Sequence, residues 1–266
     1  MIYLRSIELK KGPDLRSGEY PFSLPLVKKF GTLKFPANVV FFIGENGSGK
    51  STILEAIAAG IKAVTVGSGS VETDRTLAHA RDLGRQFRFT WNRRTHRGFF
   101  LRAEDFFNYS RKMNDTVKEM LELEKEYENR FSGYALKLAK GAASGQRSRV
   151  VERYGEDLDA NSHGESFLKL FKQRLVPGGL YLLDEPEVPL SPQRQLTLLS
   201  MMRETSEKHD CQFIVATHSP ILMALPGAVL YSFDSYPLKK IAYRDIEHVN
   251  ITRNFLNNPE GFLKHL

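Results

Sequence analysis

Residues 44 to 51 read Gly-Glu-Asn-Gly-Ser-Gly-Lys-Ser, and this stretch decides which fold the chain can adopt. It matches the pattern Gly-x4-Gly-Lys-Ser in full. The glycines let backbone N–H groups wrap around an anion, and a helix that begins here adds the positive end of its dipole. The motif therefore predicts a phosphate-binding P-loop between a strand and a helix.

The flanking sequence has the pattern that a P-loop requires. Asn38 to Ile43 is a short apolar run that predicts a buried strand, and Ser51 to Ile61 has apolar residues at helical spacing. Lys50 is expected to reach the β- and γ-phosphates of ATP, and the Ser51 hydroxyl to bind Mg²⁺. The predicted ATP-binding residues here are Gly44, Glu45, Asn46, Gly47, Ser48, Gly49, Lys50, Ser51 and Thr52.

A second motif, Leu180-Tyr-Leu-Leu-Asp-Glu185, is an apolar strand that ends in two carboxylates. Alone this pattern is often only a strand end, but downstream of a P-loop it is typical of a Walker B element. Asp184 is then placed to hold Mg²⁺ with Ser51, at the sheet edge where α/β folds bind ligands. Glu185 is placed to orient or deprotonate the attacking water.

A third motif, Phe213-Ile-Val-Ala-Thr-His-Ser-Pro220, is a predicted strand that delivers a histidine at its carboxyl end. A lone histidine in such a place is more often structural. In the company of a P-loop, His218 is well placed to contact the γ-phosphate and the water. Glu185, His218 and Lys50 are therefore the predicted catalytic residues.

The fourth motif is Asn161-Ser-His-Gly-Glu165, which precedes a predicted helix from Ser166 to Leu175. Ser162 followed three residues later by Glu165 is a capping box. A capped helix N-terminus is also an anion site, so a structural role and a phosphate-binding role can hold together.

The order of these motifs resembles the ATP-binding-cassette (ABC) ATPases. The spellings Thr-His-Ser-Pro and Gly-Glu-Asn-Gly-Ser-Gly-Lys-Ser-Thr resemble the soluble branch, with its structural-maintenance-of-chromosomes (SMC) proteins, DNA-repair ATPases and small bacterial AAA/ABC ATPases. The resemblance covers roughly residues 1 to 235. It implies an α/β P-loop NTPase fold with a mostly parallel central sheet, an N-terminal antiparallel β part and a helical subdomain. It also implies a head-to-tail dimer that sandwiches two ATP molecules, each bound by Ser162, Gly164 and Glu165 of the other subunit.

The sequence departs from the ABC pattern at several positions. The signature usually begins Leu-Ser-Gly-Gly, whereas Asn161 and His163 replace the Leu and the first Gly here, and Ser191 stands where transporters have an Asp after Walker B. No clear Q-loop glutamine follows a strand. The candidates for that place are Arg102 and Gln86, and those for stacking on adenine are Tyr20 and Phe22.

The chain is expected to form a single ABC-type ATPase domain over residues 1–266, with a helical subdomain inserted at about 103–175. The charged, helix-forming stretch from Ala103 to about Lys140 looks too short for a long coiled-coil arm. The remaining segments are predicted as a strand at 1–10, loops and short strands at 11–36, a loop at 64–80, two strands around a turn at 85–101, and a Gly/Ser-rich polar stretch at 141–164.

Composition limits the partners and the compartment. The formal net charge is +7, and arginines alternate with aromatics between Arg81 and Arg102. Such a stretch can bind nucleic acid, but it also describes strands with one solvated face, which is the more common case. The single cysteine, Cys211, excludes an internal disulfide and favours a cytoplasmic protein. The N-terminus alternates like a strand rather than a signal peptide, and no apolar run suits direct membrane insertion.

These observations favour a soluble, cytoplasmic ATP hydrolase that forms an ATP-dependent homodimer. Closure of the dimer would act on a partner protein (a nuclease, a toxin or another effector) or on DNA or RNA, as in repair or defence. One alternative is the ATP-binding subunit of a membrane ABC transporter, which the missing Q-loop glutamine disfavours. Another is a nucleotide-gated module that binds DNA or RNA and hydrolyses slowly, which the basic residues 81–102 motivate.

Overall fold

The computed structural model of the chain describes residues 1–10, 18–66, 71–154 and 163–264. Its strands are β1 (Leu4–Leu9), β2 (Thr32–Lys34), β3 (Val39–Ile43), β4 (Phe87–Trp91), β5 (Gly98–Arg102), β6 (Leu180–Asp184), β7 (Gln212–Ala216), β8 (Val229–Ser232) and β9 (Lys239–Ile241). Its α-helices are α1 (Pro25–Lys28), α2 (Lys50–Ile61), α3 (Ala78–Gln86), α4 (Ala103–Arg130), α5 (Gly133–Tyr154), α6 (His163–Arg174), α7 (Pro192–Lys208), α8 (Pro220–Met223), α9 (Glu247–Asn257) and α10 (Pro259–Leu263). The described residues also form the 3₁₀ turns η2 (Arg75–Leu77) and η3 (Tyr243–Asp245).

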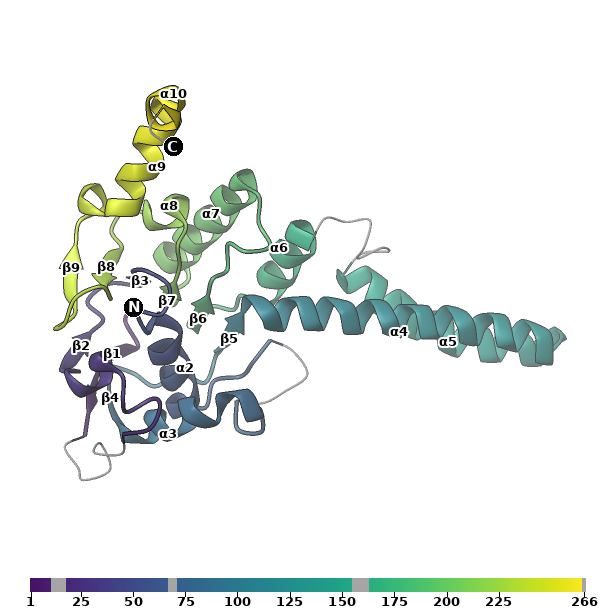
Figure 1. Ribbon diagram of the computed structural model, residues 1–266. Coiled ribbons are helices and arrows are strands. Elements are labelled where there is room, and N and C mark those ends of the chain that lie inside the picture. Colours follow the sequence, from purple (N-terminus) through teal and green to yellow (C-terminus); the bar gives the residue numbers. More distant parts are fainter. Residues whose placement is uncertain (11–17, 67–70, 155–162, 265–266) are drawn as a thin grey trace.

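The larger sheet has the strand order β5-β6-β7-β3-β8-β9 and is parallel except for β9 (Figure 1). Every residue of β3, β6 and β7 is buried, as expected for central strands covered on both faces. The predicted α/β fold with a mostly parallel sheet is therefore confirmed. Since β3, β6 and β7 run in one direction, the motifs that follow them meet at one sheet edge.

The smaller sheet has the order β2-β1-β4 with antiparallel pairing, which confirms the expected N-terminal antiparallel β part. Helix α2 packs between the two sheets. Its Ile53 and Ile57 share one apolar cluster with Ile7 of β1 and Phe42 of β3. The helix that follows the P-loop is therefore held on both sides by the core.

The other face of the large sheet is covered by α6, α7, α8 and the first turn of α9, whereas the rest of α9 projects away from the sheet (Figure 1). Aromatic rings dominate this layer: Phe171 of α6 lies edge-on to Phe99 of β5, and Tyr181 of β6 stacks on Phe213 of β7. Val249 of α9 is buried in the same cluster. The C-terminal segment is thus anchored to the sheet that carries the site.

The two strands expected at residues 85–101 exist, but they do not pair with each other. Strand β4 pairs with β1 in the small sheet, whereas β5 pairs with β6 in the large one. Gly98, where β5 begins, has φ +112°, and a Cβ there would lie 1.8 Å from the carbonyl oxygen of Leu180. Only glycine allows this close approach of β5 to β6.

Two segments are helical although the sequence did not predict helices there. Helix α3 begins at Ala78, inside the expected loop at 64–80. Helix α5 continues to Tyr154, through part of the Gly/Ser-rich stretch at 141–164. Packing of α5 against α4 offsets the low helix propensity of its glycines.

Helices α4 and α5 form a hairpin that projects from the rest of the molecule (Figure 1). The 28 residues of α4 make this a short arm, roughly 40 Å in length at 1.5 Å per residue. In the described part of the chain, no helix is long and apolar enough to cross a membrane.

The side chain of Gln212 joins the two sheets. Its Oε1 accepts hydrogen bonds from the backbone N–H groups of Tyr3 and Leu4, both at 2.9 Å, and its Nε2 donates to the Leu4 carbonyl at 2.9 Å. The residue is fully buried. An amide can both donate and accept here, which explains why the start of β1 is fixed beside β7.

We expect Gln212→Ala to lower the free energy of unfolding by about 3 kcal/mol, because buried backbone groups of Tyr3 and Leu4 lose their partners. Chemical denaturation monitored by circular dichroism measures the change. The matched control is Gln193→Ala, which truncates an exposed glutamine on α7. Equal stability of the two variants would contradict this role of Gln212.

Candidate nucleotide-binding site

The P-loop joins the end of β3 to the start of α2, as its sequence predicts. Gly49 caps the helix in the left-handed conformation, with φ +94°. The Lys50 side chain is 4% exposed, and its Nζ donates to the carbonyl oxygens of Gly44 and Glu45 at 2.8 and 2.9 Å. The loop therefore curls around its own lysine, with the ammonium group at the centre of the anion site.

Burial lowers the pKa of the Lys50 ammonium, while nearby carboxylates raise it again. The carboxylates that raise the pKa of Lys50 most are Glu185, Asp234 and Asp184, in that order. Asp234 also accepts a hydrogen bond from the backbone N–H of Glu45 at 2.7 Å, so it holds the P-loop directly. Sequence reasoning missed Asp234, although it follows the β8 strand just as Asp184 ends β6.

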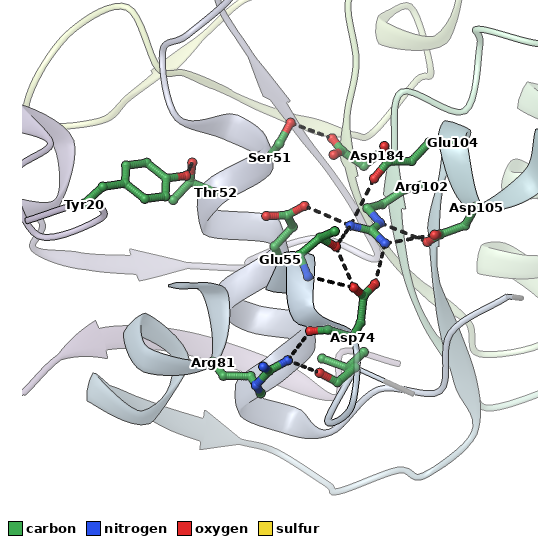
Figure 2. A network of polar contacts seen from close by, with 12 residues as sticks. Tyr20, Ser51, Thr52, Glu55, Asp74, Arg81, Arg102, Glu104, Asp105 and Asp184 are labelled. Carbon is green, nitrogen blue, oxygen red and sulfur yellow. Dashed lines mark hydrogen bonds and ion pairs between the residues drawn. The ribbon is translucent and has the colours of Figure 1, made fainter. Parts of the chain in front are cut away.

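Ser51 and Asp184 meet across the sheet edge, with the Ser51 hydroxyl donating to Asp184 Oδ1 at 3.0 Å (Figure 2). The Asp184 side chain is 8% exposed. Burial raises the pKa of its carboxyl to about 7; the Ser51 hydrogen bond opposes the rise, and Glu55, Glu185 and Glu187 add to it. A hydroxyl beside a buried carboxylate fits Mg²⁺, which takes few protein ligands and fills its other positions with phosphate oxygens and water.

Glu185 sits in a strained turn directly after β6. Its φ is +48°, a left-handed value that is uncommon for a residue with a side chain, and its N–H donates to the Ala216 carbonyl at 2.9 Å. The turn brings Glu185 Oε1 to 3.9 Å from His218 Nε2. Strain of this kind is concentrated at functional sites.

His218 is fixed by contacts on its backbone and on the residue that follows it. Its N–H donates to Glu187 Oε1 at 2.7 Å, and the Ser219 hydroxyl donates to Gln195 Oε1 at 2.6 Å. Burial lowers the pKa of the His218 imidazole, and the Lys50 charge lowers it further. The ring is therefore neutral near pH 7, and its Nε2 is buried without a hydrogen-bond partner in the described part of the chain.

Arg102 occupies the end of β5, in register with Asp184 of β6. Its guanidinium is 7% exposed and pairs with Asp74 and Asp105 at 2.8 Å, Glu104 at 3.0 Å and Glu55 at 3.7 Å (Figure 2). Burial raises the pKa of Glu55 to about 7, and the Arg102 charge opposes this shift. Gln86, the other candidate for the Q-loop place, ends α3 beside the small sheet. Of the two, Arg102 is the one beside the Walker B strand.

Most arginines between Arg81 and Arg102 are committed to contacts within the chain. Arg85 pairs with Asp82 and Arg88 with Glu8, while Arg81 and Arg97 donate to backbone carbonyls. The alternation of arginines and aromatics in this stretch thus reflects contacts within the chain. Fewer of these arginines are available to bind nucleic acid than their number suggests.

Gly164 and Glu165 lie at the start of α6, away from α2 of the same chain (Figure 1). Gly164 packs closely on the Pro189 carbonyl and the Arg194 side chain, and Glu165 pairs with Lys169 at 3.3 Å. Ser162, the third predicted signature residue, lies outside the described residues. Within one chain, Gly164 and Glu165 therefore do not complete the P-loop site.

Tyr20 lies beside the first turn of α2, where its hydroxyl is 3.1 Å from Thr52 Oγ1 (Figure 2). Its ring is 47% exposed and meets His79 edge-on. Phe22 instead packs partly buried against the core between the sheets. Of the two aromatic candidates, Tyr20 is the one with an exposed ring next to the P-loop helix.

A P-loop, a buried carboxylate and a histidine at one edge of a parallel sheet define a P-loop nucleotide-binding protein. Two family models match parts of the chain: one described as "AAA domain" at residues 27–135, and one described as "AAA domain, putative AbiEii toxin, Type IV TA system" at residues 166–224. The first match includes the P-loop, and the second includes Asp184, Glu185 and His218. With the geometry, they confirm the resemblance to the P-loop ATPases.

Solved structures with similar folds have low sequence identity. A structure titled as a putative metal-chelate type ABC transporter is 17% identical, with 96% of this chain and 89% of that chain covered and a TM-score of 0.49. The SMC head domain from Thermotoga maritima is 15% identical, with 91% and 100% covered and a TM-score of 0.43. A dimeric ATP-binding cassette bound to ADP and Pi is 14% identical, with 91% and 99% covered and a TM-score of 0.42. No curated protein matches the sequence.

The raised pKa of Asp184 predicts a pH dependence of stability in the nucleotide-free protein. Between about pH 4 and pH 7 the folded chain retains a proton on Asp184 that the unfolded chain has released, so stability falls as pH rises through this window. Asp184→Asn removes this contribution. We expect it to raise the melting temperature relative to the wild type at pH 8 and to change it much less at pH 5.

Thermal unfolding without nucleotide or Mg²⁺, scanned from pH 5 to pH 8, measures the effect. Asp82→Asn, which removes an exposed carboxylate on α3, is the control. A gain from Asp184→Asn that is equal at both ends of the pH range would count against a raised pKa of the Asp184 carboxyl in the folded protein.

Proposed function

We propose that this chain is an ATPase that binds Mg-ATP at residues 44–52 and hydrolyses it between two copies arranged head to tail. One observation carries the proposal: Lys50, the Ser51–Asp184 pair and the Glu185–His218 pair converge at one edge of the large sheet. Each has the chemistry that phosphoryl transfer to water requires at that place.

Lys50 and the P-loop amides would bind the phosphates. The Lys50 ammonium now bonds two loop carbonyls, and phosphate oxygens can replace or add to these acceptors. Ser51 and Asp184 would hold Mg²⁺, which when bound supplies positive charge against the β- and γ-phosphate oxygens. A P-loop lysine acts as a point charge on the same oxygens.

Glu185 and His218 would act on the water and the γ-phosphate. The Glu185 carboxylate accepts a proton from the attacking water or orients it. The neutral His218 imidazole can donate one N–H from its buried Nε2 to a γ-phosphate oxygen. Their separation of 3.9 Å, with no bond between them, leaves both groups free for substrate.

A second copy would be needed because the start of α6, which carries Gly164 and Glu165, lies away from α2 of its own chain (Figure 1). The Glu165 side chain is 45% exposed at the start of α6, where it pairs with Lys169 at 3.3 Å and with Arg194 at 3.9 Å. Ser162, Gly164 and Glu165 of one subunit would then complete the ATP site of the other. ATP would close this dimer, and hydrolysis would open it.

The work of the cycle would be done on a partner protein or nucleic acid, in repair or defence, within the cytoplasm. The α4–α5 hairpin could carry a movement from the nucleotide site to a bound partner, because α4 begins directly after Arg102 at the edge of the site. A nuclease, a toxin or another effector fits such an arm. DNA or RNA is the other class of partner, because the exposed Arg93 and Arg94 could bind its phosphates.

We expect Glu185→Gln to bind ATP but to lose at least a hundredfold in turnover, because the amide cannot accept the proton of the water. The variant should therefore accumulate as an ATP-bound dimer. Phosphate release measures turnover, and light scattering after size exclusion, with and without Mg-ATP, measures the dimer.

Two variants serve as controls for this test. Lys50→Ala should remain monomeric with ATP and show no turnover, since it lacks the phosphate-binding charge. Glu207→Gln, an exposed carboxylate on α7, should behave as the wild type. Wild-type turnover by Glu185→Gln would overturn its assignment as the base.

A further inference from the structure

The ring of a second histidine lies beside His218. His248, the second residue of α9, has its ring centroid 6.5 Å from that of His218, with the two planes tilted by 53°. The Nε2 atoms of both rings are buried and have no hydrogen-bond partner in the described part of the chain. Leaving a buried polar atom unpaired destabilises a folded protein, so two such atoms in adjacent rings need an explanation.

The segment that carries His248 is fixed against the loop that carries His218. Ile246 and Val249, on either side of His248, are each 3% exposed and belong to the core of the large sheet. Upstream, the Tyr243 hydroxyl donates to the Pro220 carbonyl at 3.0 Å, two residues beyond His218. The position of His248 relative to His218 is therefore set by packing and by a direct bond between the two segments.

Charged groups from four elements face His218. Lys50 of α2 and His248 of α9 disfavour a proton on the imidazole, whereas Glu185 after β6 and Glu45 of the P-loop favour one. The Glu187 carboxylate accepts its hydrogen bond from the backbone N–H of His218, not from the ring. A neutral imidazole has a single N–H, so its tautomer and its rotation decide whether it can donate to phosphate.

We propose that His248 is a positioning residue of the ATPase site, which lies against His218 and holds its imidazole in the orientation that meets the γ-phosphate and the attacking water. This inference rests on the proposed function. The unpaired Nε2 atoms are consistent with it, because nucleotide and its water supply the partners that the chain does not. Through His248, the C-terminal helix α9 becomes part of the catalytic structure.

The test compares His248→Ala, His248→Phe and His248→Gln by steady-state ATPase kinetics as a function of pH. We expect the Ala variant to lower kcat roughly tenfold, with KM for Mg-ATP within about twofold, because a misplaced catalytic group affects the chemical step. Its acid limb of kcat should move to higher pH, since the repulsion that disfavours a proton on His218 is removed. Phe keeps the ring volume and should be as slow as Ala, whereas Gln keeps a polar N–H and should recover part of the rate.

Thr252→Ala is the matched control, because it removes a 2.8 Å hydrogen bond to the His248 carbonyl without touching the ring. Wild-type kinetics are expected for it. Wild-type kcat and pH profile in all three His248 variants would overturn the inference and leave the ATPase proposal intact. An equal loss in Thr252→Ala and His248→Phe, with lowered melting temperatures, would assign His248 a structural role and also overturn it. If the wild-type chain shows no ATP turnover that depends on Lys50, the proposed function fails and this inference fails with it.

Discussion

The contact between the Ser51 hydroxyl and the Asp184 carboxylate is the constraint on which the rest of the site depends. It joins the first turn of α2 to the end of β6, and it is the hydrogen bond that offsets the burial of Asp184. The neighbouring carboxylates of Glu55, Glu185 and Glu187 raise the cost of that burial. A divalent cation held by Ser51, Asp184 and phosphate oxygens would offset the negative charge that these carboxylates bring together.

The same edge is connected to the projecting helices through Glu55. This side chain, on α2, acts on Asp184 by its charge and also forms an ion pair with Arg102. Arg102 in turn binds Asp74 and the first turn of α4 through Asp105 (Figure 2). Charged contacts therefore link the nucleotide site to the base of the α4–α5 hairpin. On the other side of the site, the His218 loop is bound to the C-terminal segment through Tyr243.

The parts of this site that the sequence predicted were those fixed by local pattern. The P-loop, the two acid- and histidine-bearing strands and their common edge follow from short motifs and from the rule for parallel sheets. Asp234 and the Arg102 cluster depend on which strands become neighbours, which no local pattern specifies. The β4 and β5 strands were predicted individually, but their separate sheets depend on the close approach of Gly98 to Leu180. The extent of α5 depends on packing against α4, since its own composition does not favour a helix.

The central claim is that a complete ATP site takes its P-loop from one copy and its signature from another. Mixing two inactive variants, Lys50→Ala and Ser162→Arg, tests it most directly, with phosphate release as the readout. In a mixed dimer one site has lost both its P-loop and its signature, whereas the other site is intact. The account predicts that the mixture regains a substantial part of wild-type turnover, although neither variant is active alone. A mixture as inactive as its components, under conditions in which mixed dimers form, would contradict it.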